Sequence, residues 1–121
     1  MDCLFCKIIK KEVPAKILYE DEKVIVIMDA FPTVDGHTLI IPKKHFIDFL
    51  ELTDEELIHI NKIAKEIGEL LLKKLNAKSL TLSVNYGERQ EIKHYHLHLL
   101  PDYRKNKASK DIQKIYEILR S

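Results

Sequence analysis

The sequence is poor in glycine, and this excludes the common glycine-rich phosphate-binding loops. Its three glycines, Gly36, Gly68 and Gly87, are too far apart to form a GxGxxG dinucleotide-binding loop or a Walker A loop. No apolar run reaches the ~20 residues that a membrane span needs, and the first residues lack the charged and then apolar layout of a secretory signal. We therefore expect no membrane partner and a cytoplasmic location.

An excess of charge of one sign is also missing. Lys and Arg number 20 against 19 Asp and Glu in 121 residues, which gives a net charge of +1. A general nucleic-acid binder needs a strong basic excess to displace the counterions of the phosphate backbone, so nucleic acid is not an expected partner. The hydrophobic content of 45% and charged content of 32% are typical of a folded globular protein. The length suits one domain with its own core.

Cysteine is scarce as well, and both copies lie near the N-terminus. Cys3 and Cys6 form a C-x-x-C pair, which in a reducing compartment favours metal binding or redox chemistry over a structural disulfide. On a helix, residues at i and i+3 project from one face, so both sulfurs could approach one ion. Thioredoxin-like redox chemistry expects a strand before the motif, which two residues cannot supply. A zinc site, a redox pair and two buried free thiols are the three interpretations.

Hydrophobic periodicity predicts an α+β domain. Helical spacing covers residues 2–11, residues 54–75 and the C-terminal end, and the Thr53 to Glu56 capping box opens the long helix. The expected strands cover 16–19, 23–28, 37–41, 80–84 and 94–100. Strands grouped on either side of one long helix favour an antiparallel arrangement. We therefore expect a five-stranded, mainly antiparallel sheet packed on the long helix, with short N- and C-terminal helices.

Three of the six histidines fall within five residues, at His94, His96 and His98. Alternate residues of a strand share a face, so the three imidazoles would lie on one face and the apolar residues between them on the other. A lone strand histidine is usually a structural bystander, but three in alternation indicate a function. Metal ligation and nucleophilic or acid–base chemistry by neutral imidazole both use such a row. His96, with a histidine on each side, is best placed as a nucleophile.

Residues 94–100, His-Tyr-His-Leu-His-Leu-Leu, resemble the His-φ-His-φ-His-φ-φ motif (φ apolar) of the histidine triad (HIT) nucleotide hydrolases and transferases. The resemblance runs from Cys3 to about Tyr103, with further matching segments in the family's order at 3–9, 17–21, 28–29, 36–45 and 84–87. It implies a HIT-like fold for a domain over residues 1–103, followed by a basic linker and an amphipathic helix over 104–121. It also implies a homodimer, because HIT proteins pair through the long helix and the adjacent strand.

The resemblance also implies an activity. HIT proteins cleave at the α-phosphate of nucleoside phosphoramidates or dinucleoside polyphosphates, here by attack of His96 to form a nucleotidyl-histidine that water hydrolyses. His98 would contact the phosphate on its leaving-group side. The substrate would be a purine nucleotide and the product of the AMP type. The other matching positions are Asp29 for the ribose hydroxyls, Asn85 and Gln90 for the phosphate or leaving group, and Leu4, Phe5 and Ile27 for the base.

Zinc-bearing HIT proteins carry two cysteines and two histidines that match Cys3, Cys6, His45 and His94. The resemblance therefore implies that these four residues hold a structural Zn²⁺. Two thiolates and two imidazoles complete a closed tetrahedral site, which would tie the N-terminal helix to the histidine segment.

The chain departs from the family pattern in the loop before the triad. Residues 87–93 are about two residues shorter than in relatives, and Arg89 stands where glycine is expected. The shorter loop leaves the preferred leaving group and the role of Gln90 open. His37 and His59 are expected to be structural or surface residues.

Several alternatives compete with these assignments. Leu4, Phe5 and Ile27, taken without the resemblance, would be ordinary core residues. A non-catalytic nucleotide-binding or scaffolding protein could keep the fold without turnover, and a nucleotidylated protein would exclude it. A metal-dependent hydrolase could carry its metal on the triad, and activity that survives a strong chelator would exclude that mechanism.

Overall fold

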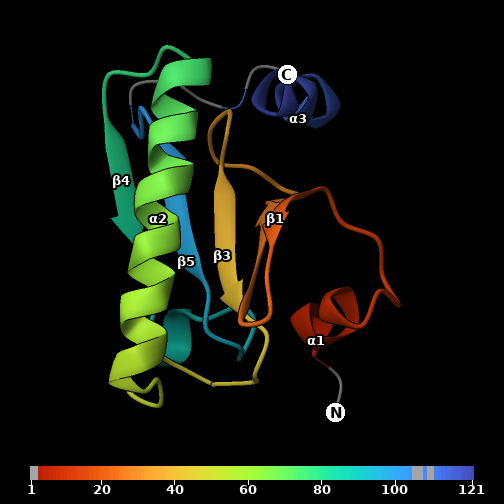
Figure 1. Cartoon of the computed structure of the whole chain (residues 1–121), viewed down its shortest axis with the longest axis vertical. Helices are drawn as coiled ribbons and strands as arrows, with labels where there is room; N and C mark the ends of the chain where they lie inside the picture. The colour runs from red at the N-terminus through yellow and green to blue at the C-terminus, as the bar shows by residue number, and fades with distance from the viewer. Residues whose placement is uncertain (1–2, 105–107, 109–110) are drawn as a thin grey trace.

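The computed structural model describes residues 3–104, 108 and 111–121. Its helices are α1 (Leu4–Ile9), α2 (Asp54–Lys74) and α3 (Ile112–Arg120), with a short 3₁₀ helix, η1 (Gly87–Arg89). The strands are β1 (Ile17–Glu20), β2 (Val24–Met28), β3 (Thr38–Pro42), β4 (Leu80–Ser83) and β5 (Leu97–Pro101). They form one five-stranded sheet in the order β1-β2-β3-β5-β4, in which all neighbours are antiparallel. The α+β prediction is confirmed (Figure 1).

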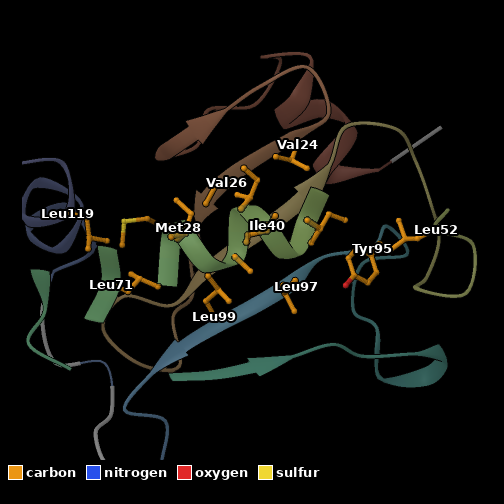
Figure 2. Close-up of a cluster of buried hydrophobic side chains, with 14 of the residues drawn as sticks. Val24, Val26, Met28, Ile40, Leu52, Leu71, Tyr95, Leu97, Leu99 and Leu119 are labelled. Atoms are coloured by element: carbon orange, nitrogen blue, oxygen red, sulfur yellow. The ribbon is translucent and has the colours of Figure 1, made fainter. Parts of the chain in front are cut away.

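The sheet is covered on both faces, because all five residues of β2 are buried. Val24 and Val26 pack with α2 in one hydrophobic cluster, which Figure 2 shows around the helix. Ile25 and Ile27 point the other way and pack with Phe5 of α1 in a second cluster. Full burial of each aliphatic side chain contributes roughly 1.5–3 kcal/mol. Alternation along one strand therefore holds α2 and α1 on opposite faces of the sheet.

The strand predicted at 94–100 begins later, at Leu97. In the antiparallel register of β3 and β5, Ile40 pairs with Leu97, so Pro42 would stand opposite Tyr95. Proline has no N–H for the ladder, and the Tyr95 N–H instead donates to the Phe46 carbonyl at 2.7 Å. The pairing therefore stops early. The alternation of faces still holds, since Tyr95 and Leu97 both belong to the cluster around α2.

The predicted helix ends need smaller corrections. Cys3 caps α1, its Sγ accepting from the Cys6 N–H at 3.3 Å. Thr53 caps α2 as predicted, its Oγ1 accepting from the Glu56 N–H at 3.1 Å. Asn76, just after α2, takes the left-handed conformation, with φ 52°.

The C-terminal helix α3 is capped by Asp111, whose Oδ1 accepts from the Gln113 N–H at 2.8 Å. Ile115 and Leu119 of α3 join the hydrophobic cluster around α2, and the division of the chain at residue 103 stays a prediction. None of the helices in the described ranges is long and apolar enough to cross a membrane.

Candidate functional site

A cavity of about 750 Å³ opens on the sheet face that carries α1. Its walls come from α1, the end of β2, the loop after β2, the segment between β4 and β5, and the triad. The predicted site residues that line it are Leu4, Phe5, Ile27, Asp29, Asn85, His96 and His98. Residues far apart in the sequence are therefore brought to one cavity.

His96 is held with one ring nitrogen bare. Its Nδ1 lies 2.8 Å from the His94 carbonyl oxygen, and because a carbonyl can only accept, Nδ1 carries the proton. The neutral ring then keeps a lone pair on Nε2. Burial lowers the pKa of His96 below its usual 6.5, against the smaller raising effect of the hydrogen bond to His94. His96 is therefore a neutral imidazole at pH 7.

The other cavity histidine, His98, is fixed by a chain of hydrogen bonds. The Thr33 N–H donates to His37 Nδ1 at 3.1 Å, so the proton of the neutral His37 ring is on Nε2. That Nε2 lies 2.9 Å from His98 Nδ1, which must accept. His98 therefore carries its proton on Nε2. Burial is the largest cause that lowers the pKa of His98 to about 4.

His98 Nε2 is buried and has no hydrogen-bond partner in the described part of the chain. Because a buried N–H without an acceptor costs about 1–3 kcal/mol, such an atom calls for an explanation. The ring lies beside His96, with ring centroids 4.8 Å apart, and both line the cavity. This N–H is therefore an unused donor beside the cavity.

His37 is a site residue that the sequence analysis missed. It is 5% exposed, lines the cavity and lies 3.4 Å from Asp29 Oδ2 through its Nε2. Its position could have indicated this role. His37 is two residues before Leu39, and Leu39 pairs with His98 across the sheet. His59, by contrast, is structural, as expected: its Nε2 lies 2.8 Å from Asp21 Oδ2 and links α2 to the β1–β2 turn.

Gln90 is buried outside the cavity lining, so nothing in this geometry supports the predicted contact with phosphate. It is 6% exposed and absent from the cavity lining. Its side-chain N–H donates to the Ile47 carbonyl at 2.6 Å, and its Oε1 accepts from the Gly87 N–H at 3.3 Å. Because the loop is short, the amide is used to anchor it.

The apolar residues of the predicted base slot divide into two kinds. Phe5 and Ile27 are each 3% exposed and belong to the hydrophobic cluster behind α1, so they are core residues that also line the cavity. Leu4 is 46% exposed and lines the cavity without joining that cluster. Asp29 stands nearby, with Oδ1 accepting from the Phe31 N–H at 2.8 Å.

Cys3, Cys6, His45 and His94 come together as a group of potential metal ligands. Cys3 Sγ lies 3.3 Å from His94 Nδ1, and Cys6 Sγ lies 3.2 Å from His45 Nδ1. The Nδ1 atoms of His45 and His94 are 3.1 Å apart. Zn–N and Zn–S bonds of about 2.0–2.3 Å in a tetrahedron separate the ligand atoms by roughly 3.3–3.8 Å. His94 Nε2 donates to the Pro42 carbonyl at 2.8 Å, which leaves Nδ1 bare to bind a cation. The donor set therefore fits a structural Zn²⁺.

A second group of metal-ligating side chains, Asp29, His37 and His98, is less suited to a cation. The Thr33 N–H occupies His37 Nδ1, so the Nε2 that faces the group carries a proton and offers no lone pair. A metal bound to His37 Nε2 would require the ring proton on Nδ1. That Nδ1–H would then face the Thr33 N–H, and two donors cannot bond to each other. This bonding disfavours a catalytic metal on the triad.

Comparison with known proteins agrees with the fold and the triad. The family model for the HIT domain matches residues 10–105. The chain is 45% identical over 103 residues to an uncharacterized HIT-like protein of Methanocaldococcus jannaschii, covering 84% of this chain and 79% of the relative.

Two solved structures have the same fold. A Zn-bound histidine triad family protein from Mycobacterium smegmatis is 31% identical, with TM-score 0.90 and coverage of 99% of this chain and 91% of that one. A hypothetical histidine triad nucleotide-binding protein from Sulfolobus tokodaii is 32% identical, with TM-score 0.88 and coverage of 98% and 89%. The chain belongs to the HIT family.

Proposed function

We propose that the protein is a nucleotide hydrolase or nucleotidyltransferase that cleaves at the α-phosphate of purine nucleoside phosphoramidates or dinucleoside polyphosphates. The observation that carries the proposal is the bare Nε2 of a neutral His96 in the cavity, fixed by the His94 carbonyl. The nucleotide-binding relative from Sulfolobus tokodaii supports a nucleotide as the ligand.

The reaction has two displacements. His96 Nε2 attacks the α-phosphorus, a P–N bond forms, and the bond to the leaving group breaks. The ring gains positive charge in this step, and the Nδ1–H bond to the His94 carbonyl becomes stronger as the donor becomes cationic. Water then attacks the same phosphorus, the P–N bond breaks, and an AMP-type product leaves with His96 neutral again.

Neighbouring groups hold the substrate during both steps. The orphaned His98 N–H donates to a phosphoryl oxygen or to the leaving-group atom, where negative charge develops. Asp29 accepts from the ribose hydroxyls, and Asn85 contacts the phosphate or the leaving group. The base lies against Leu4, Phe5 and Ile27.

We also propose that Cys3, Cys6, His45 and His94 hold one structural Zn²⁺, an assignment supported by their donor geometry and by the Zn-bound relative from Mycobacterium smegmatis. The ion would supply a fixed junction between α1 and the triad segment. His94 orients itself for this through its bond to Pro42, as ligating histidines generally do through their second nitrogen.

The first prediction concerns this metal. Protein purified without chelators or air should contain about one Zn²⁺ per chain by elemental analysis. Cys6→Ser should reduce the zinc content and lower the midpoint of thermal unfolding, because structural zinc contributes directly to folding. It should lower the rate per folded molecule much less. Zinc-free protein of unchanged stability would refute the site.

A homodimer is the second prediction. β4 lies at an edge of the sheet and, with the residues after it, exposes Leu82, Val84 and Tyr86, while α2 exposes Ile58. Exposed apolar edge strands are normally covered, since they otherwise pair without control. Light scattering at micromolar concentration should give twice the chain mass of 14.2 kDa, and the mass of a single chain would contradict the dimer.

The third prediction is that His96→Ala abolishes turnover. With an adenosine phosphoramidate, single-turnover rates should fall by about 10³-fold or more, as happens when a covalent nucleophile is removed. The fold and zinc content should persist, because the core side of this segment is formed by Tyr95 and Leu97. His59→Ala, outside the cavity, is the matched control and should stay active. A His96→Ala variant with more than about a tenth of the wild-type rate would rule out this mechanism.

The fourth prediction concerns pH. Attack requires unprotonated His96, and burial lowers its pKa below 6.5, so the neutral form persists to more acidic pH than for an ordinary histidine. The acid limb of kcat/KM, corrected for uncatalysed hydrolysis, should have its midpoint below pH 6.5. The charge of Glu91 raises this pKa, so Glu91→Gln should move the midpoint lower still. A midpoint above pH 6.5 would contradict the assigned burial effect.

A further inference from the structure

One cationic side chain on the cavity wall has no partner. Arg89 ends η1 and lines the cavity. Its guanidinium makes no hydrogen bond or ion pair with the residues that the structure describes. The other cation of the lining, Lys16, is engaged with the ring of Tyr116, its Nζ 5.8 Å from the ring centroid.

The backbone that carries Arg89 is fastened on both sides. The Gln90 side chain is tied to Ile47 and to Gly87, and the Gln90 N–H donates to the Gly87 carbonyl at 3.0 Å. Gly87 takes a positive φ of 74°, which suits glycine and tightens the turn. Arg89 is therefore an exposed, unpaired side chain on an anchored support, and less ordering is needed to bind through it.

The cavity has little other positive charge to offer an anion. Burial lowers the pKa of His37 and of His98, so both are neutral at pH 7. Two carboxylates, Asp29 and Glu91, face the same cavity. A substrate with a second anionic group would be repelled unless a cation received it.

The position of Arg89 indicates which part of a substrate it would meet. It lies on the segment that also brings Asn85 into the cavity, the residue proposed to contact the phosphate or the leaving group. Glu91, two residues further on, lines this cavity but also a second one of about 390 Å³ beside Cys3 and His45. Arg89 lines only the first cavity and forms no ion pair with Glu91.

We propose that Arg89 is a specificity residue that selects substrates whose leaving group carries its own oxyanion, a carboxylate or a phosphate. The planar guanidinium binds either group through two parallel N–H donors. This inference rests on the proposed function, because it concerns the leaving group of that reaction.

Two matched pairs of adenosine phosphoramidates test it. In the first pair, AMP is linked through nitrogen to glycine or to glycinamide. In the second pair, it is linked to 2-aminoethyl phosphate or to 2-aminoethanol. Within each pair the substrates differ mainly in the oxyanion. The quantity to compare is the kcat/KM ratio of the anionic to the neutral substrate, in wild type and variants, because intrinsic leaving-group differences then cancel.

Arg89→Gln should lower this ratio by about 10- to 100-fold, the range for loss of a charged hydrogen-bonding partner. If the ratio falls in the first pair alone, the group that Arg89 recognises is a carboxylate. If it falls in the second pair alone, that group is a phosphate. Arg89→Lys keeps the positive charge but not the two parallel donors, so its ratio should lie between those of wild type and Arg89→Gln. Lys65→Gln, an exposed change of equal charge on α2, should leave the ratio unchanged.

Other results overturn the inference. Ratios that change less than about threefold in Arg89→Gln would reject it while wild-type turnover still supports the proposed function. If Lys16→Gln lowers the kcat/KM ratio and Arg89→Gln does not, the selectivity belongs to Lys16 and the inference is wrong. If wild type turns over none of the four substrates, the proposed function fails and this inference with it. Should Arg89→Gln unfold, the Arg89→Lys ratios decide in the same way.

Discussion

The arrangement of the site depends on His94, because one fully buried residue bonds in three directions. Its Nε2–H donates to Pro42 at the end of β3. Its Nδ1 faces the sulfur of Cys3 at 3.3 Å. Its carbonyl oxygen receives the Nδ1–H of His96. The end of β3, the N-terminal helix and the His96 ring therefore all contact the same residue, and a shift of His94 would displace all three.

A second constraint is that the buried histidines are neutral and each has one assignable proton. Burial lowers the pKa of His94 and of His98 to about 4. Backbone groups then decide the tautomers: the His94 carbonyl for His96, and the Thr33 N–H, acting through His37, for His98. The result is a bare nitrogen on His96 next to a free N–H donor on His98. The proposed mechanism requires this arrangement, and it needs no group to change protonation before attack.

The helices, the strands and the shared face of the three histidines could be predicted from the sequence, because they follow from local periodicity. The alternation around His96 placed the imidazoles and the apolar residues on opposite faces, although the strand itself starts only at Leu97. The early end of pairing depends on Pro42 meeting Tyr95 across the sheet, a register that no local pattern contains. The grouping of the two cysteines with His45 and His94 came from resemblance and not from spacing, since the ligands are up to 91 positions apart.

Two residues have positions in the structure that the sequence alone does not reveal, and the physical cause is the same for both. Gln90 and His37 are polar side chains whose roles depend on which backbone groups lie nearby in space. The Ile47 carbonyl removes Gln90 from the cavity, and the Thr33 N–H orients His37 toward His98. Composition and periodicity carry no information on such tertiary hydrogen bonds. The short loop over residues 87–93 carries both the buried Gln90 and the exposed Arg89.

Trapping the covalent intermediate tests the account most directly. Wild-type protein would be mixed with an adenosine phosphoramidate, quenched in alkali within the first turnover and digested with trypsin. The account predicts that the peptide of residues 94–104 gains the mass of one nucleotidyl group and that fragmentation places it on His96. An adduct on His94 or His98, or turnover with no adduct on any histidine, would contradict it.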